Sequence, residues 1–370
     1  MKQSICAPED KNEKMICILL STFNGANYLS AQLDSLLNQT CQEWTLMVRD
    51  DGSHDCTLEI LDDYAQRDSR ITILPRGESL GAAGSYLTLL LAAPEADYYA
   101  FCDQDDVWLP DKLTRSIQAL AGLMDSPAMY CSSLFLVDRN LNPLGRSRRH
   151  SRGPSFENAL IQNIATGCTL TLNVAAVRLI RKRMPLTNRI VMHDWWCYLV
   201  ISAFGHVIFD PSPTLYYRQH EENQIGELPG ISFWRNRFRR FCLKSEKGLL
   251  TRQVSEFFSC WSIFLPMKKA VYLERVIQVM GEKKVVRRFG LLMAMRLQRQ
   301  TILDTLLFRL LLLFGYYHAT DSIARARPEN PDGRDKFVSD LEMRSFSLWQ
   351  ENQDIKQRHT PVGCTSETED

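Results

Sequence analysis

The sequence predicts an α/β fold with a doubly wound, mostly parallel sheet, followed by a basic helical region. Between residues 15 and 125, short apolar runs alternate with segments of helical apolar spacing. Polar and acidic residues follow the ends of these runs, which is where such sheets bind ligands. Charge is divided unevenly, since residues 1–230 hold 20 basic and 27 acidic residues and residues 231–300 hold 16 and 4.

The elements of the first half follow from local patterns. Continuous apolar runs, typical of buried parallel strands, occupy residues 15–22, 44–48, 70–74 and 97–102. Apolar residues at helical spacing predict helices over residues 28–38, 57–67, 81–93 and 112–124. Pro110 stands where a proline suits the start of the last helix. The repeated order of strand, loop and helix predicts a doubly wound sheet.

Beyond residue 127 the pattern is less regular. We expect one strand over residues 128–137, and then a basic, mobile loop over residues 139–154. A further strand is expected within residues 160–172, where Gly167 indicates a close approach of another group to the backbone. Asp194 is expected to cap a helix over residues 195–204. Shorter strand-like segments follow at residues 207–210 and 214–220.

The region from residue 231 to residue 317 changes character. Residues 233–241 interleave four aromatic residues with four arginines. Residues 303–317 are strongly apolar, but the run is shorter than the ~20 residues of a membrane span and contains Asp304 and Arg309. We therefore expect an interfacial amphipathic helix or a buried one. Attachment to an anionic membrane surface through residues 231–317 and a role as helical appendage or dimer interface both stay open.

Composition excludes several classes of protein. The chain has 370 residues, 45% hydrophobic and 24% charged, which is neither collagen-like nor disordered overall. The net charge of +1 argues against a polybasic nucleic-acid binder, so we expect no nucleic-acid partner. Eleven cysteines are present without a C-x-x-C pair, and four of them lie in apolar runs: Cys17, Cys102, Cys131 and Cys168. We expect reduced thiols, a cytoplasmic location and no secretory signal in residues 1–14.

Three acids within four residues carry the chemical argument. Asp103, Asp105 and Asp106 directly follow the apolar run at residues 97–102. Alternation along a strand would turn Asp103 and Asp105 to the same side, where two carboxylates repel each other unless a cation joins them. Mg²⁺ shares such oxygen ligands with substrate phosphates. The motif alone leaves open a metal–diphosphate site or a solvated acidic turn that caps the next helix.

Two further motifs are ambiguous by themselves. Asp51, in the run Asp50-Asp51-Gly52-Ser53, could accept hydrogen bonds from a nucleobase or a ribose, or could belong to a simple turn. Neither G-x-G-x-x-G after the first strand nor a P-loop motif is present, so dinucleotide and P-loop sites are disfavoured. Arg218 and His220 could contact a phosphate and a metal ion, or could form surface ion pairs.

The run His193-Asp194-Trp195-Trp196 also has two interpretations. Asp194 could act as a general base beside an indole wall, Trp195 and Trp196, that stacks on the apolar face of an acceptor sugar. Alternatively, Asp194 only caps its helix and the tryptophans fill the core.

Together and in this order, the motifs resemble the family 2 glycosyltransferases, which have the GT-A (nucleotide-diphospho-sugar transferase) fold. The similarity is closest to the rhamnosyltransferase-like subgroup that builds bacterial surface polysaccharides, and it covers roughly residues 15–226. The matching segments are Ser21-Thr22-Phe23-Asn24-Gly25, Asp50-Asp51-Gly52-Ser53, Asp103-Gln104-Asp105-Asp106, His193-Asp194-Trp195-Trp196 and Tyr217-Arg218-Gln219-His220. Five motifs in order are far more specific than any one of them.

The resemblance implies a role for each motif residue. Thr22, Asn24 and Asp51 would hold the nucleotide, Asp103 the ribose and Asp106 the donor sugar, with Arg218 nearby. Asp105 would bind Mg²⁺ or Mn²⁺ on the diphosphate, with His220 close to the same metal. Asp194 would be the catalytic base, with Trp195 and Trp196 on the acceptor side.

The implied function is an inverting, metal-dependent transfer of a sugar, L-rhamnose included, from a dTDP- or UDP-linked donor. The acceptor would be a hydroxyl of a saccharide or a lipid-linked oligosaccharide, and the enzyme would work in the cytoplasm or at the inner face of the membrane. The alternative is a catalytically inactive binding module that keeps the fold. The implied domains are a disordered segment 1–14, a GT-A domain 15–230, a basic helical region 231–323 and a polar, partly disordered tail 324–370. The GT-A domain would consist of a nucleotide-binding half, 15–125, and an acceptor half, 126–230.

Overall fold

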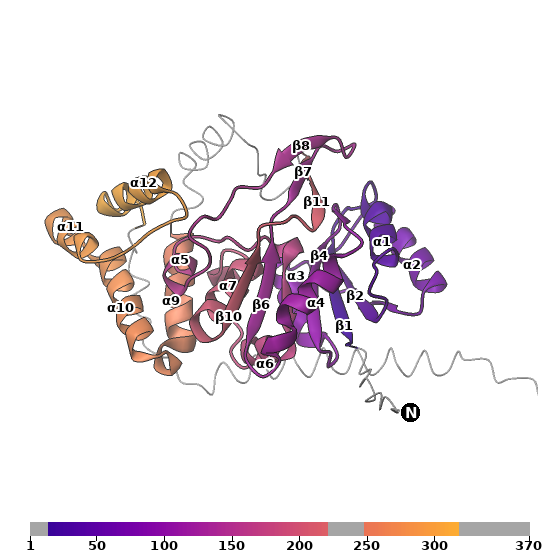
Figure 1. Cartoon of the computed structure of the whole chain (residues 1–370), viewed down its shortest axis with the longest axis horizontal. Coiled ribbons are helices and arrows are strands. Elements are labelled where there is room, and N and C mark those ends of the chain that lie inside the picture. The colour runs from indigo at the N-terminus through magenta and orange to yellow at the C-terminus, as the bar shows by residue number, and fades with distance from the viewer. Residues whose placement is uncertain (1–13, 221–247, 318–370) are drawn as a thin grey trace, which may run out of the picture.

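A seven-stranded sheet forms the centre of the computed structural model, which describes residues 14–220 and 248–317 (Figure 1). From one edge to the other its strands are β10 (His206–Asp210), β6 (Ala128–Ser132), β9 (Thr171–Asn173), β4 (Tyr98–Asp103), β1 (Ile16–Thr22), β2 (Trp44–Asp50) and β3 (Ile71–Ile73). Strand β9 is antiparallel to β4 and β6, and the other neighbouring pairs are parallel. The predicted mostly parallel sheet is confirmed.

Helices cover both faces of this sheet because side chains alternate along its strands. In β1, Ile18 and Leu20 belong to one buried cluster, and Cys17 and Leu19 belong to the other. The first cluster contains residues of α1 (Leu29–Leu37), α2 (Thr57–Arg67) and α4 (Lys112–Leu120). The second contains residues of α3 (Gly81–Ala92), α6 (Val174–Arg181) and α7 (His193–Phe204). The sheet is therefore doubly wound, as the repeated strand–loop–helix pattern predicts.

A second, smaller sheet was not expected from the sequence. Its strands, in order, are β5 (Val107–Trp108), β11 (Leu215–Arg218), β7 (Phe135–Val137) and β8 (Pro143–Arg146). The single strand predicted over residues 128–137 is wrong, because residues 133 and 134 belong to no strand and separate β6 of the large sheet from β7 of the small one. The loop predicted over residues 139–154 likewise contains β8, which pairs with β7.

The segment 160–172 is also different from its prediction. Only its end enters a strand, β9, because the N–H and hydroxyl of Thr169 both bond to the carbonyl of Thr166 and close a 3₁₀ turn over Gly167–Thr169. The predicted close approach at Gly167 is confirmed: a Cβ there would lie 3.1 Å from Nε2 of His193. The four cysteines that lie in apolar runs of the sequence are all buried: Cys17, Cys102, Cys131 and Cys168.

Four α-helices follow the α/β part within residues 248–317, so the predicted helical C-terminal region is confirmed there. They are α9 (Leu249–Trp261), α10 (Met267–Gly281), α11 (Val285–Met293) and α12 (Ile302–Leu313), which extend from one side of the sheet (Figure 1). Helix α9 joins the core beneath α7, where the Phe257 ring lies 6.0 Å from the ring of Trp196. No described helix combines the length and the hydrophobicity needed to cross a bilayer.

Several predictions fall outside the described residues. They concern the segment before Lys14, the domain boundary at residue 230, the aromatic and arginine-rich residues 233–241, and the tail 324–370.

Candidate active site

A cavity of about 730 Å³ lies where β1 and β4 end. Parallel pairing sets Ser21 opposite Asp103, and Thr22 opposite Asp50, so polar motifs that are far apart in sequence meet at one edge. Residues 163–167 and the start of α7 (His193–Phe204) also line the cavity.

The cavity brings together most of the predicted site residues. Seven of them line it: Thr22, Asn24, Asp51, Asp103, Asp105, Asp194 and His220. Asp106 and Arg218 are buried next to these residues but are absent from the cavity wall. Neither Trp195 nor Trp196 lines the cavity.

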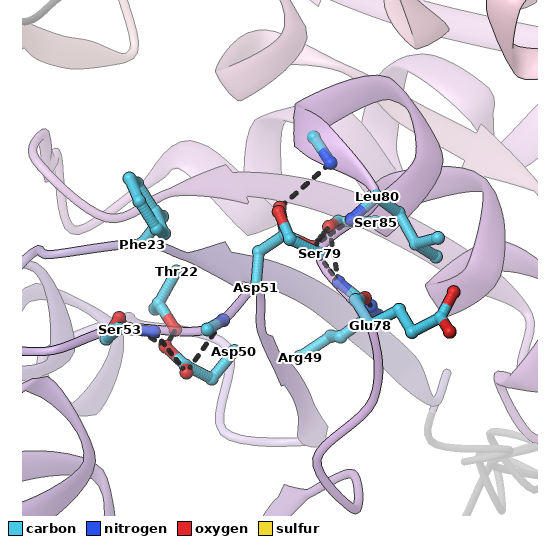
Figure 2. A network of polar contacts seen from close by, with 12 residues as sticks. Thr22, Phe23, Arg49, Asp50, Asp51, Ser53, Glu78, Ser79, Leu80 and Ser85 are labelled. Atoms are coloured by element: carbon cyan, nitrogen blue, oxygen red, sulfur yellow. Dashed lines mark hydrogen bonds and ion pairs between the residues drawn. The ribbon is translucent and has the colours of Figure 1, made fainter.

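Asp50 organises the loop after β2. Its carboxylate accepts hydrogen bonds from the Thr22 hydroxyl at 3.0 Å and from the N–H groups of Gly52 and Ser53 at 3.1 and 2.9 Å (Figure 2). Gly52 has φ +97°, a backbone conformation that glycine adopts without strain. Asp50 therefore ties the ends of β1 and β2 together below the cavity.

Asp51 anchors the start of α3. Its carboxylate accepts from the hydroxyls of Ser79 and Ser85, from the N–H groups of Leu80 and Gly81 at 2.7 and 2.8 Å, and from the Arg49 guanidinium (Figure 2). Burial would raise the pKa of Asp51, but these hydrogen bonds outweigh it and lower the pKa. A carboxylate offers about four acceptor positions, so a nucleobase N–H would have to displace one of these donors.

The three acids of the next motif have different surroundings. Asp103 accepts from the Tyr86 hydroxyl at 2.5 Å, while burial and then the charge of Asp105 raise its pKa to about 6. Asp105 lies 2.8 Å from Nε2 of His220. Asp106 is fully buried, and burial followed by the charges of Asp105 and Asp103 raises its pKa well above the ordinary value. Asp103 and Asp105 thus face the cavity, and Asp106 lies behind them.

Arg218 joins β11 to the acidic turn. Its Nε donates to the carbonyl of Asp105 at 2.8 Å, its Nη1 donates to the carbonyl of Arg139, and its backbone N–H reaches Oδ1 of Asp106 at 3.3 Å. The guanidinium carbon also lies 4.7 Å from the centre of the Tyr28 ring. These contacts hold the turn that presents Asp105 to the cavity.

Two groups of side chains could hold a metal ion. Asp105 and His220 form one pair on the cavity wall, next to Asp103. Oxygen atoms of Asp103 and Asp106 and Sγ of Cys168 form the other, all within 4.8 Å of one another. Burial raises the pKa of the Cys168 thiol well above its ordinary value, which disfavours the thiolate that a metal needs. The carboxylates and imidazole on the cavity side therefore fit Mg²⁺ or Mn²⁺ better.

Asp194 lines the same cavity as Asp103 and Asp105 and lies in the first turn of α7. Burial raises the pKa of Asp194 to about 7, and the charge of Asp103 also raises this pKa. The hydrogen bond from the Trp195 N–H to Oδ1 of Asp194 lowers the pKa, but by less than burial raises it. The predicted cap is wrong, since α7 begins at His193 and Met192 holds the N-cap position. Asp194 is thus a buried carboxyl in the cavity wall that changes its protonation state near neutral pH.

The predicted tryptophan wall is wrong for Trp196, whose side chain is fully buried in the core against Phe257. Trp195 is partly buried, and its indole N–H donates to the carbonyl of Ala159 at 2.6 Å. Trp196 therefore packs in the core and Trp195 contacts the end of α5 (Phe156–Ala159), since successive helical residues point in different directions.

Among the cavity residues that were not predicted as site residues, four make contacts that bear on the site. Tyr86 lies in an apolar helical pattern and meets Asp103 only through the fold. His193 stacks on Tyr86 at 4.0 Å, is buried, and burial lowers its pKa to about 3. Gln104 exchanges two hydrogen bonds with the backbone of Phe23, at 2.8 and 2.9 Å. His150 reaches the cavity from the basic loop. His193 and Gln104 had a sequence signal, because each stands inside one of the quoted motifs, next to Asp194 and Asp103 respectively.

The family model and the similar curated proteins are all glycosyltransferases. Residues 17–184 match the family described as Glycosyl transferase family 2. The chain is 28% identical over 240 residues to the dTDP-rhamnosyl transferase RfbG of Shigella flexneri, covering 62% of this chain and 80% of that protein. It is 34% identical over 109 residues to the UDP-Glc:alpha-D-GlcNAc-diphosphoundecaprenol beta-1,3-glucosyltransferase WfgD of Escherichia coli, covering 30% of this chain and 42% of that protein. A structure of S. aureus TarS 1–349 in complex with UDP is similar at 14% identity, with a TM-score of 0.48 over 82% of this chain and 89% of that one.

Proposed function

This chain is a glycosyltransferase that belongs to glycosyl transferase family 2, and we propose that it moves a sugar with inversion from a nucleotide-diphosphate donor to an acceptor hydroxyl. One observation carries this proposal: Asp103, Asp105 and Asp194 all line a single cavity. Asp103 and Asp105 suit a diphosphate with its cation, and the Asp194 carboxyl suits a base.

The donor in this proposal is dTDP-linked or UDP-linked, with L-rhamnose as the sugar to be tested first. Support comes from the similarity to a protein described as a dTDP-rhamnosyl transferase. The nucleotide would lie over Thr22 and Asn24 at the end of β1, and its ribose against Asp103. Asp51 and Arg218 would act on the donor by fixing the start of α3 and the acidic turn, and Asp106 would act through the same turn.

Asp105 and His220 would hold Mg²⁺ or Mn²⁺, because they offer an oxygen and a nitrogen ligand at the cavity wall. When bound, such an ion supplies positive charge that neutralises the leaving diphosphate.

Asp194 would be the general base. With a pKa of about 7, its carboxylate can accept the proton of the acceptor hydroxyl near neutral pH. The acceptor oxygen then bonds to the anomeric carbon as the bond to the diphosphate oxygen breaks, and the two events on opposite faces invert the configuration. The nucleoside diphosphate leaves with the electron pair, and the proton stays on Asp194.

The acceptor in this proposal is a saccharide or lipid-linked oligosaccharide of a bacterial surface polysaccharide. WfgD, which resembles part of this chain, is described as acting on a diphosphoundecaprenol-linked sugar. An acceptor of that class lies in the membrane surface. We therefore place the enzyme in the cytoplasm, attached to the inner face of the membrane through helices within residues 231–317.

The experiment that tests this function is calorimetric titration of the full chain with dTDP, UDP, GDP and CDP, each with and without Mn²⁺. We expect one nucleotide to bind, and only with the metal. Asp105→Ala should abolish that binding, whereas Asp62→Ala, at an exposed carboxylate of α2, should leave it unchanged. Equal affinity with and without Mn²⁺ would contradict the metal assignment. Binding of no nucleotide would favour an inactive module.

A further inference from the structure

Helices α11 and α12 turn large apolar side chains to solvent. We define the α11–α12 apolar face by its exposed residues: Val285, Val286, Phe289 and Met293 of α11, and Ile302, Leu303, Leu306, Leu310 and Phe314 of α12 and its end. Val286 is 84% exposed, and Ile302 is 69% exposed. Scattered exposed apolar residues are ordinary, but nine on two neighbouring helices form a patch that indicates an interaction surface.

On each helix, the residues of the α11–α12 apolar face recur at helical spacing. On α12, Ile302, Leu306 and Leu310 recur every four residues along the outer side. The inner side buries Asp304 and Thr305 with Phe308 and Leu312. Surface helices of globular proteins show the reverse, with polar residues outside. Because the exposed side of α12 is entirely apolar, its contact with water is unfavourable and its burial against another surface would be favourable.

The two helices are held to each other by a buried arginine. Nη1 of Arg288, on α11, donates to the carbonyls of Leu312 and Leu313 at 3.2 and 2.8 Å. A cation at the C-terminus of a helix is favourable, since the last carbonyls carry partial negative charge. The α11–α12 apolar face therefore belongs to one fixed pair of helices, which lies at one end of the molecule (Figure 1).

Basic side chains surround this face. Lys283, Lys284 and Arg287 are exposed at the start of α11, and Arg296 is exposed after its end. Residues 262–317 as a whole hold ten Lys and Arg against three Asp and Glu. Apolar side chains beside cationic ones suit a surface that is apolar within and anionic at its boundary.

We propose that the α11–α12 apolar face inserts into the interface of a bilayer that contains anionic lipid. Insertion is interfacial, since no described helix can cross the bilayer. A second copy of the chain fits less well, because a twofold contact would bring the same basic residues together. This deepens the proposed function by assigning its membrane contact to two helices, and it rests on that function only for the choice of acceptor.

The helices also contact the loop that reaches the cavity. Arg148 lies 3.8 Å from Asp304, the Ser151 hydroxyl donates to the carbonyl of Gln300 at 3.1 Å, and the Arg152 N–H donates to the Gln300 side chain at 3.0 Å. His150, between these residues, lines the cavity. Membrane attachment through α12 would thus hold this side of the cavity near an acceptor in the bilayer.

The test is co-sedimentation of the full chain with vesicles of phosphatidylcholine alone or mixed equally with phosphatidylglycerol. We expect binding to the mixed vesicles, and a loss of roughly tenfold in partition for Phe289→Glu and for Leu306→Glu. Leu144→Glu is the matched control, because Leu144 is an exposed leucine on β8. Lys283→Glu should weaken binding to the mixed vesicles alone, and added salt should do the same.

Three further measurements keep the outcomes distinct. Circular dichroism melting should show each variant folded, as expected at exposed positions. Nucleotide binding should be unchanged in all variants, so that a failure of the donor site and a failure of this proposal give different results. Full vesicle binding by both apolar variants would overturn the proposal. So would a dimer of the wild type, seen by sedimentation, that Phe289→Glu dissociates while vesicles bind neither protein.

Discussion

Asp194 owes its chemistry to its surroundings more than to its residue type. An exposed aspartate titrates near pH 4 and is a weak base at neutral pH. Burial against the start of α7 raises the pKa of Asp194 to about 7, and the nearby charge of Asp103 contributes. Its base strength is therefore matched to the operating pH, which is the condition for efficient general base catalysis.

Asp194→Asn should lower kcat by about 10²–10⁴-fold, since the amide cannot accept the proton. For the wild type, kcat/KM should rise with pH through about 7, because the ionised carboxylate is the active form. The variant should lose this rise. Steady-state rates across pH, with nucleotide affinity measured in parallel, check both expectations.

The control for this variant is its stability. A folded-state pKa raised above the ordinary value means that ionised Asp194 destabilises the fold as pH rises through about 7. Asp194→Asn should therefore melt at a higher temperature than the wild type above that pH and at a similar temperature well below it. Wild-type turnover by the variant would show that another group is the base.

Tyr86 tunes the acid that is proposed to contact the ribose. Its hydroxyl donates to Asp103 at 2.5 Å and thereby lowers the pKa of that carboxyl, against the larger effects of burial and of Asp105. Tyr86→Phe should raise the pKa of Asp103, so that nucleotide binding is lost at a higher pH than in the wild type. Titrations at several pH values measure this shift. The control is Tyr99→Phe, on the same strand as Asp103, which removes a hydroxyl that donates to the carbonyl of Pro94. This variant should leave the pH dependence unchanged.

Residue-level prediction succeeded where a motif follows a strand. Asp103, Asp105 and Asp51 could be placed at the cavity because the end of a parallel strand fixes where the next residue lies. Trp196 was misplaced because adjacent helical residues point about 100° apart, and the sequence alone does not say which one faces the core. Tyr86 could not be found, since its contact with Asp103 depends on how α3 crosses the sheet.

At the scale of elements, the start of α3 depends on a single carboxylate. Asp51 accepts the N–H groups of Leu80 and Gly81, which the helix itself leaves unsatisfied, and both nearby serine hydroxyls. The pKa of Asp51 is lowered, so this stabilisation is present above its ordinary pKa and is lost as pH falls through the folded-state value.

Asp51→Asn should lower the melting temperature of the nucleotide-free protein by several degrees, because an amide N–H₂ would face other donors. The difference from the wild type should shrink in acid. Ser79→Ala removes one donor and should have a smaller effect, and Asp62→Asn, at an exposed site on α2, should have none. An unchanged melting temperature with weaker nucleotide binding would instead favour direct contact with the base.

Elements were predicted best where strand and helix alternate regularly. The helix over residues 57–67 has the same bounds in the structure as α2, since its apolar residues repeat at helical spacing. The run at residues 128–137 is apolar apart from Ser132 and Ser133, yet it is divided between two sheets by the break at residues 133 and 134. Continuous burial conceals such a change of partner, because apolar residues suit either sheet.

For the whole molecule, the charge division in the sequence does not mark a division of the core. The described basic helices share one buried cluster with the α/β part, and this cluster reaches from β1 to α12. Phe257 of α9 has its ring 6.0 Å from that of Trp196 and 5.9 Å from that of Phe156. Charge patterning depends on surface residues, so it could suggest the proposed membrane contact but not how the helices and the α/β part pack.

Phe257→Ala tests whether these parts unfold together. The side chain is fully buried, and its loss should lower the free energy of unfolding by about 3–5 kcal/mol. If the core is shared, the variant should melt in one transition at a lower temperature, and saturating nucleotide should raise that single temperature. Calorimetric scans with and without nucleotide measure this, with Phe314→Ala as the exposed phenylalanine control.

Two transitions, of which only the nucleotide-independent one responds to Phe257→Ala, would show that the helices unfold separately. A single shared transition would mean that deleting the chain from residue 248 onward uncovers Trp196 and Phe156 and leaves the catalytic part unable to keep its fold.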